Sequence, residues 1–555
     1  MKKHTCKLLA LALAIVFLLS VMAGCGSESN TTGTSGSNES SGSSTTETSG
    51  SSGSSSAGSE NSAPKIFTIG VETNPTNLDP YEKAASTDTG RIMVKAVTDT
   101  LWVADENGEL QMSLATSAEW TGDLELTIAL REGVKFSNGN DFTADDVMYT
   151  LQHMSEASRT ASVAACFDLE ATTTPDAYTV VLKFKEYDAS IMSKLGYCNF
   201  CMLDKETCEG MEDMTSWLIG TGPYKLAGDG VNDKSGWEES VQYKLVRNEN
   251  YWGEAPYYDE IDIKFYTEET TRYSELMSGG LDAALLTSGT YINNVKNGAV
   301  PNAELFQKEA GYATGITMAV NTETTSGVLS DINVRKALAH GIDIETLVTI
   351  LGDGVYAVAD SNVSSACWAY KNVGTYKYDP AAAKEYLAAA GYSVDNPLTV
   401  RLAVRNSAFY DSLAEGMQAN LAEIGINLDL SGMGDIGSVF QKLQNKEADI
   451  SIGYVADNTG NDPGSLMQEL NPNASNPLCG LVNEEAIELY YSGRSSKDNN
   501  ERKTAYQQLQ QIIHDEYLFI PMYISTSNYA YMSSHSSVVN ALDAYNVFNV
   551  AQLTD

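Results

Sequence analysis

The sequence predicts an α/β fold that is divided into lobes. Residues 378–392 (YDPAAAKEYLAAAGY) have the pattern of a capped helix, and residues 415–430 (EGMQANLAEIGINLDL) that of a helix followed by a strand. Helix-then-strand units of this kind are typical of α/β folds. Residues 65–555 are about 490 residues, more than one ordinary core holds, so two or three lobes are expected.

The chain begins with the layout of a secretory signal peptide. A positive end, MKKHTCK, precedes an apolar run at 8–21 that is shorter than the roughly 20 residues a membrane-spanning helix needs. Small residues then precede Cys25, which resembles the lipobox of bacterial lipoproteins, in which the cysteine carries the lipid. Met22 stands where Leu is common in that pattern. We expect residues 1–24 to be removed and Cys25 to be lipidated; the alternative is an ordinary signal peptide with a cysteine near its cleavage point.

A low-complexity segment follows this cysteine. Residues 26–64 are mostly Ser, Gly and Thr and include no Val, Leu, Ile, Met or aromatic residue. Such a composition buries too little apolar surface to offset chain entropy, so a flexible coil is expected. Its root-mean-square reach would be about 35 Å. We interpret residues 25–64 as a lipidated tether, although an unrelated disordered tail would have the same conformation.

The first half of the folded region is predicted to be rich in strands. Apolar alternation or turn residues indicate a strand at 65–71, a hairpin at 100–112 and a strand at 124–130. Residues 142–154 indicate a helix, because Thr143 can cap it and Asp146 stands where a capping-box acid is found.

The second half alternates helices and strands. In the helix pattern of 378–392, Asp379 can cap the start and Gly391 can end the helix, whereas Gly425 separates helix from strand in the next unit. The closing run AYNVFNVAQL at 544–553 alternates apolar and polar residues, so we expect it to join a sheet as a strand.

Composition excludes several classes of function. The formal net charge of −38 argues against nucleic-acid partners, because binding to nucleic acid needs a basic surface. We attribute the acidity to the need of a protein outside a cell to stay soluble. No HExxH, GxSxG or phosphate-loop motif is present, so no enzyme is predicted. The histidines are dispersed, and the single CxxC of Cys198 and Cys201 has no second pair, so we predict no metal and no cofactor. Disulfides or free buried thiols are both open for the following cysteines: Cys166, Cys198, Cys201, Cys208, Cys367 and Cys479.

A series of motifs resembles one protein family over nearly the whole folded region. In order they are NLDPYEK, LATSAEW, LREGVKFSNGNDFTADDVMYTL, GTGPYKL, RNENYWGEAPYYDEI, VRKALAHGID, YDPAAAKEYLAAAGY and IGYVADNTGNDPGSL. No single motif is decisive, but eight in order are very specific. They resemble the extracellular solute-binding proteins of peptide- and nickel-type ABC importers, also called family 5, which include dipeptide- and oligopeptide-binding lipoproteins.

This resemblance implies a two-lobed α/β clamp of the periplasmic-binding-protein type (type II), with an extra subdomain in the first lobe. Lobe I would comprise residues 65–308, with the subdomain at about 102–217, and a return at 527–555; lobe II would span 309–526. Two chain crossings would form the hinge. The glycines of GTGPYKL are expected to allow a close backbone approach where the chain crosses between lobes.

The resemblance also implies a ligand site. In the family's peptide binders, an acid in a segment shaped like GYVADN pairs with the peptide's terminal ammonium, and Asp457 is the matching position, next to Tyr454 and Asn458. A buried ammonium needs such a charge partner. The alternative is that Asp457 only turns the loop.

Three further residues complete the predicted site. Arg405, in a loop after a predicted strand, is the candidate for a ligand carboxylate, with a surface salt bridge as the alternative. Trp368 and Tyr410 are candidates for the pocket wall, although such aromatic residues often serve packing alone.

The predicted function is therefore a lipid-anchored solute-binding subunit of an ABC importer that captures short peptides between its lobes. Its partners would be the permease and ATPase subunits of the transporter, with no nucleic acid, and it would be a monomer that contacts the membrane only through its lipid. It would lie on the outer face of the cytoplasmic membrane, facing the periplasm where an outer membrane exists. The same scaffold binding an oligosaccharide or a nickel or other metal chelate, or sensing a peptide signal, remains an alternative.

Overall fold

The computed structural model describes most of the chain after the low-complexity segment. The described residues are 63–555 without 73–77, 83–86, 106–108, 158–159, 210, 212–217, 229–234, 239, 321–326, 435, 454–461 and 468–482. The predicted signal peptide, Cys25 and nearly all of the tether lie outside them. No helix within the described residues is long and apolar enough to cross a membrane.

A mixed sheet of eleven strands runs through the described part of the chain. Its strands lie in this spatial order: β15 (Ile426–Asp429), β14 (Leu398–Ala403), β16 (Ile450–Gly453), β13 (Ala303–Met318), β17 (Phe519–Met532), β12 (Ala283–Leu285), β1 (Ile66–Val71), β11 (Glu260–Phe265), β10 (Gln242–Arg247) and β8 (Tyr224–Leu226), with β9 (Trp237–Glu238) paired to β10. Strands β14, β15 and β16 are parallel, whereas β13 is antiparallel to both β16 and β17.

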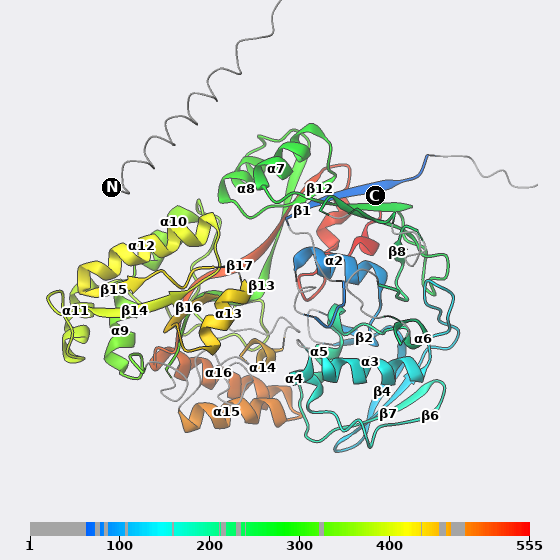
Figure 1. Cartoon of the computed structure of the whole chain (residues 1–555), viewed down its shortest axis with the longest axis horizontal. Coiled ribbons are helices and arrows are strands. Elements are labelled where there is room, and N and C mark those ends of the chain that lie inside the picture. Colours follow the sequence, from blue (N-terminus) through cyan, green and yellow to red (C-terminus); the bar gives the residue numbers. More distant parts are fainter. Residues whose placement is uncertain are drawn as a thin grey trace, which may run out of the picture. The chain divides into compact units, whose positions relative to one another are not determined.

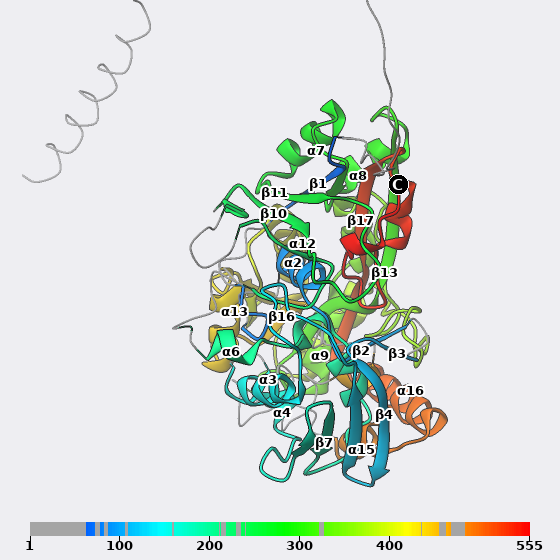
Figure 2. The ribbon, with the colours of Figure 1, turned by 90° about the vertical axis from the view of Figure 1, so that its right-hand side faces the viewer.

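Strands β13 and β17 join the two halves of this sheet. They pair from Ala303, opposite Met532, to Thr317, opposite Phe519, and Figures 1 and 2 show them side by side along their length. At one end β17 pairs with β12, and at the other β13 pairs with β16. The chain therefore crosses between the halves along these two strands.

Two large hydrophobic cores lie in the described part of the chain. The first gathers buried side chains from residues 67–285 and 529–553, and the second from residues 316–523. We call the parts of the chain around these cores lobe I and lobe II. Lobe I is discontinuous, because its core takes residues from both ends of the folded region; the predicted boundaries at 308 and 526 stay predictions.

Lobe I adds two small sheets and several helices to its half of the large sheet. One small sheet consists of β2 (Trp102–Ala104) and β3 (Leu110–Met112). The other has four strands in this spatial order: β4 (Ala115–Gly122), β5 (Glu125–Leu130), β7 (Thr179–Lys183) and β6 (Thr173–Asp176). Its helices are α2 (Asp88–Val97), α3 (Ala144–Glu156), α4 (Ala161–Ala164), α5 (Ile191–Leu195), α6 (Lys205–Cys208), α7 (Glu269–Ser278) and α8 (Gly289–Lys296), with 3-10 turns η2 (Cys198–Phe200), η4 (Ser536–Asn540) and η5 (Val550–Gln552).

Lobe II packs helices around the strands β14, β15 and β16. The helices are α9 (Ile332–Gly341), α10 (Ile344–Leu351), α11 (Pro380–Ala389), α12 (Ala408–Ile424), α13 (Ile436–Gln444), α14 (Pro463–Leu466), α15 (Glu484–Ser495) and α16 (Asn499–Asp515). Helix α12 connects β14 to its parallel neighbour β15, which is the helix crossover that parallel strands require.

Local sequence patterns that predicted capped helices are confirmed. The backbone N–H of Thr143 donates to the Asp146 carboxylate (2.8 Å) at the start of α3. Asp379 accepts from the backbone N–H of Ala382 (3.0 Å) at the start of α11. Helix α12 ends at Gly425 in a left-handed conformation, as predicted, but begins earlier than the pattern at 415–430 indicated.

The prediction of a strand at 544–553 is wrong. Asp543 accepts hydrogen bonds from the backbone N–H groups of Tyr545 and Val547 (2.9 and 3.0 Å), and Asn546 has a φ of 58°, so the chain turns instead of extending. Apolar side chains of the run, including Phe548, are buried in the core of lobe I. Apart from one isolated bridge between Phe548 and Leu542, the alternation therefore reflects burial and not the pairing of a strand.

The glycines of GTGPYKL have a different place from the predicted one. A Cβ on Gly220 or Gly222 would meet the backbone of Val97 and Thr98 at less than 3 Å, so these glycines do permit a close approach. That approach is to the end of α2 within lobe I, because β8 pairs with β10 there and not with β13 or β17.

The described cysteines form no disulfide. Cys166, Cys198, Cys201, Cys208 and Cys367 are all buried and none of these five forms a disulfide. Burial raises the pKa of the Cys166, Cys208 and Cys367 thiols to about 12, so they stay protonated. Of the two alternatives, disulfides or buried thiols, these five cysteines are buried thiols. Cys479 lies outside the described residues.

Candidate ligand-binding site

One edge of the lobe II sheet collects the ends of two parallel strands. Strands β14 and β16 pair in parallel, so both carboxyl ends reach the same edge. Arg401 in β14 makes a two-point ion pair with Asp449 (2.9 and 2.7 Å) beside β16, which holds the two strands in register. Arg405 follows β14, and residues 454–461 follow β16. The predicted Tyr454, Asp457 and Asn458 lie in that second segment, outside the described residues.

Arg405 and Tyr410 lie together at this edge. Arg405 is exposed, two residues beyond β14. Ser407 then accepts from the backbone N–H of Tyr410 (3.2 Å) and starts α12. The guanidinium carbon of Arg405 lies 5.2 Å from the centre of the Tyr410 ring, which is a cation–π distance. The structure therefore brings two of the predicted site residues into contact.

Tyr410 belongs to a group of four aromatic residues that we call the hinge aromatic cluster, namely Tyr356, Phe409, Tyr410 and Tyr523. The hydroxyl groups of Tyr410 and Tyr523 are 3.2 Å apart, and Tyr523 lies in β17. The rings of Tyr356 and Phe409 lie 5.0 and 5.6 Å from that of Tyr523. Burial raises the pKa of Tyr356 to about 12 and that of Tyr523 as well, so both hydroxyls remain protonated donors.

This cluster also reaches lobe I. The hydroxyl of Tyr356 donates to the backbone carbonyl of Thr287 (2.9 Å), just before α8. Sequence reasoning missed Tyr356, Phe409 and Tyr523. Phe409 precedes Tyr410 directly and could have been noticed, but Tyr523 is 113 residues away in the chain, so only the tertiary fold brings it there.

Trp368 occupies a second position, against α16. Its half-buried ring lies 5.3 Å from the guanidinium carbon of Arg502. Arg502 makes a buried ion pair with Asp462 (2.6 Å), and its Nε donates to the carbonyl of Gly493 (2.8 Å). Asp462 is the first described residue after the segment 454–461. Trp368 and Arg502 therefore brace the point where the predicted ligand segment ends.

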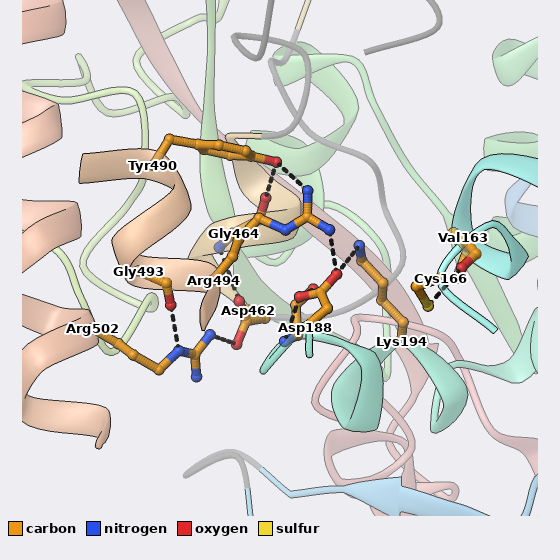
Figure 3. Close-up of polar contacts among 11 residues, drawn as sticks. Val163, Cys166, Asp188, Lys194, Asp462, Gly464, Tyr490, Gly493, Arg494 and Arg502 are labelled. Carbon is orange, nitrogen blue, oxygen red and sulfur yellow. Dashed lines mark hydrogen bonds and ion pairs between the residues drawn. The ribbon is translucent and has the colours of Figure 1, made fainter. Parts of the chain in front are cut away.

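A third group links the lobes, and we call it the inter-lobe charge cluster: Asp188 and Lys194 of lobe I and Arg494 of lobe II. Figure 3 shows the Asp188 carboxylate between the two cationic side chains. It lies 2.5 Å from Arg494 Nη2 and 3.7 Å from Lys194 Nζ, and its side chain is only 4 % exposed. Burial by itself raises the pKa of Asp188, but Lys194 and Arg494 outweigh it and hold that pKa well below the ordinary range.

An open depression on lobe I does not resemble a ligand site. It has a volume of about 550 Å³ and acidic lining residues, among them Asp146 and Asp204. Both carboxylates already accept hydrogen bonds, for example from Lys205 N–H and the Asn138 amide. Within the described residues no group of three His, Cys, Asp or Glu side chains could hold a metal ion.

Comparison with known proteins identifies the family. Residues 109–477 match the family described as bacterial extracellular solute-binding proteins, family 5 Middle. The chain is 26 % identical over 447 residues to heme-binding protein A of Haemophilus influenzae (75 % of this chain, 79 % of that protein). It is 25 % identical over 480 residues to the glutathione-binding protein GsiB of Escherichia coli (83 % and 89 %).

Solved structures share the fold at low sequence identity. The periplasmic binding protein DppA from Helicobacter pylori, in complex with the peptide STSA, has a TM-score of 0.74 at 20 % identity and covers 88 % of this chain and 96 % of its own. NikA from Staphylococcus aureus, in complex with Ni(L-His)2, has a TM-score of 0.73 at 17 % identity (88 % and 100 %).

These matches confirm the expected two-lobed α/β architecture. The family match also confirms that the chain is a solute-binding protein and not an enzyme. The chain belongs to family 5 of the bacterial extracellular solute-binding proteins, the solute-binding components of ABC importers.

Proposed function

We propose that this chain captures short peptides between its lobes and delivers them to an ABC permease. The observation that carries the proposal is the strand edge of lobe II, where Arg405 and the segment 454–461 follow neighbouring parallel strands. Arg405, a cation, follows one strand, and Asp457, an acid, belongs to the segment that follows the neighbouring strand. This pair of charges suits a ligand that has both a carboxylate and an ammonium group. The relatives named glutathione-binding protein support this ligand class, because glutathione is itself a tripeptide.

Each site residue has a distinct role in this proposal. Asp457 pairs with the terminal ammonium of the peptide, where a buried cation needs a matched charge. Arg405 binds the carboxylate, and its fork of donors allows a two-point contact. Tyr454 and Asn458 flank Asp457, while Tyr410 and Trp368 form apolar walls. The ion pair of Arg502 with Asp462 fixes the residue that directly follows the segment 454–461.

The N-terminal region completes the proposal. A lipid on Cys25 would hold the protein at the outer face of the cytoplasmic membrane, and the tether of about 35 Å would let the clamp reach its permease. The protein would act as a monomer beside permease and ATPase subunits. Intact-mass measurement of membrane-extracted protein tests the anchor: we expect a mature chain that begins at Cys25 and carries acyl groups, and an unmodified Cys25 would contradict this.

Isothermal titration calorimetry tests the ligand site. The purified protein is titrated with trialanine, glutathione and Ni(L-His)2, after mass spectrometry of any small molecule that copurifies. We expect Asp457→Ala to weaken tripeptide binding by about 2–5 kcal/mol, since it removes the partner of a buried charge. Asp395→Ala, at an exposed position of lobe II, is the matched control and should not change affinity. Equal affinities for both variants would show that Asp457 does not bind the ligand. Binding of only the nickel complex would show that the ligand is a metal chelate and not a peptide.

A further inference from the structure

The inter-lobe charge cluster joins segments of the two lobes that lie far apart in the sequence. Asp188 lies in the loop before α5 of lobe I, and Arg494 lies in the last turn of α15 of lobe II, 306 residues later in the sequence. Besides the ion pair, the backbone N–H of Ala189 donates to the carbonyl of Arg494 (2.8 Å). Figure 3 shows the side chains of both lobes meeting at this point.

The backbone contact adds a reason for the lobes to meet here. The last four carbonyl groups of a helix have no partner within that helix. Arg494 is the penultimate residue of α15, so its carbonyl is one of these groups, and the N–H of Ala189 from lobe I satisfies it. Contact between the lobes therefore supplies a hydrogen bond that α15 cannot make internally.

Each half of the contact has a partner in its own lobe. Asp188 accepts from the backbone N–H and the hydroxyl of Ser190 (2.9 and 2.6 Å) and lies near Lys194. Arg494 donates to the hydroxyl of Tyr490 (3.4 Å) in its own helix. Both side chains can therefore keep their positions when the lobes separate, and only the bonds that cross between lobes must form or break. That is the behaviour of a reversible contact.

A second ion pair connects the same two parts of the chain at the surface. Lys497, just after α15, lies 3.3 Å from Asp123, but these side chains are 55 % and 101 % exposed. Exposed pairs contribute little, because water and salt screen them. The Asp188 carboxylate, at 4 % exposure, is far better shielded. The buried contact, and not the surface pair, is therefore the one able to bias the arrangement of the lobes.

We propose that the Asp188–Arg494 contact is a latch that sets the balance between open and closed arrangements of the two lobes. With the latch formed, a larger fraction of the protein is closed before ligand arrives. Apparent affinity scales with the fraction that is competent to bind, so the latch strengthens binding of any solute held between the lobes. This effect on affinity rests on the ligand site proposed above, whereas the effect on lobe closure does not.

The test removes the latch from the lobe II side. Arg494→Met deletes the charge but keeps an apolar side chain, and it leaves Asp188 with Lys194 and Ser190. Lys497→Met, at the exposed pair, is the matched control. Small-angle X-ray scattering of the ligand-free proteins should give a larger radius of gyration for Arg494→Met than for the unsubstituted protein and Lys497→Met. Trialanine affinity, by calorimetry, should fall at least about tenfold for Arg494→Met only.

The readouts separate the latch from the ligand proposal. An Arg494→Met variant that scatters as the unsubstituted protein does would overturn the latch, whatever its affinity. A larger radius of gyration for Arg494→Met supports the latch even if trialanine does not bind the unsubstituted protein. Absence of trialanine binding would count against the proposed peptide site and not against the latch. Near-ultraviolet circular dichroism confirms folding first; if Arg494→Met does not fold, Arg494→Gln is measured in the same way, with the same two outcomes.

Discussion

Removing the positive charge of Arg502 tests whether α16 holds the end of the predicted ligand segment. Arg502→Met keeps most of the apolar stem but deletes every donor of the guanidinium. The variant loses the ion pair with Asp462 (2.6 Å), the hydrogen bond to the Gly493 carbonyl (2.8 Å) and the cation–π contact with Trp368 (5.3 Å). Of the described partners of the Asp462 carboxylate, the N–H of Gly464 (2.9 Å) remains.

The expected loss of stability follows from the burial of this pair. The side chains of Arg502 and Asp462 are 5 % and 6 % exposed, so the variant leaves a carboxylate buried without its counter-charge. Removing one partner of a buried ion pair costs about 3–5 kcal/mol. For a unit of roughly 150–250 residues, that corresponds to a fall in melting temperature of about 6–20 °C.

Differential scanning calorimetry of the ligand-free protein measures this change. Lys497→Met, which removes an exposed cation close to α16, is the control. It should change the free energy of unfolding by no more than about 0.5 kcal/mol. The double variant Arg502→Met with Asp462→Asn should recover part of the loss, because no unpaired charge stays buried. A loss below about 1 kcal/mol in Arg502→Met would refute the reasoning, since it would mean that Asp462 finds water or another partner without cost.

Two further predictions concern a glycine and a histidine. Gly425 has a φ of +97°, and an added Cβ would lie 2.5 Å from the Ser393 backbone, whereas Gly374 has a φ of +96° and open space around it. Gly425→Ala should therefore lower the free energy of unfolding by at least about 1 kcal/mol more than Gly374→Ala, and equal losses would contradict the contact. The hydrogen bond to Asp79 (3.0 Å) raises the pKa of His153, so this contact stabilises the fold below the ordinary histidine pKa and is lost as pH rises through the raised value. His153→Gln should reduce the difference in melting temperature between about pH 5.5 and pH 8.5; an unchanged difference would exclude this contact as its cause.

Local chemistry explains why several elements were predictable. A helix cap acts over three residues, so Asp379 with Ala382 and Thr143 with Asp146 identify helix starts from neighbouring positions alone. The position of Arg405 just after a strand was predictable for a similar reason, because the apolar pattern of β14 ends close to Arg405 in the sequence. Its role in ligand binding stays a prediction. These features depend on contacts within one turn or one strand.

Apolar alternation was a less reliable guide. Residues 544–553 alternate as a strand would, yet Asp543 and Asn546 turn the chain, and the apolar side chains are buried in the core of lobe I. The same alternation suits any segment with one face buried, so the pattern does not distinguish a strand from a packed turn. Where the pairing partner is distant, local sequence cannot decide.

The sequence by itself determined the family, the two-lobed α/β architecture and the positions of the capped helices, because eight ordered motifs and short-range hydrogen bonds are all present along the chain. Only the tertiary structure decided which residues meet. The hinge aromatic cluster brings Tyr523 to Tyr410, and the inter-lobe contact brings Arg494 to Asp188, across 113 and 306 residues. Such contacts depend on how two strands cross between lobes, and nothing near either residue in the sequence specifies its partner.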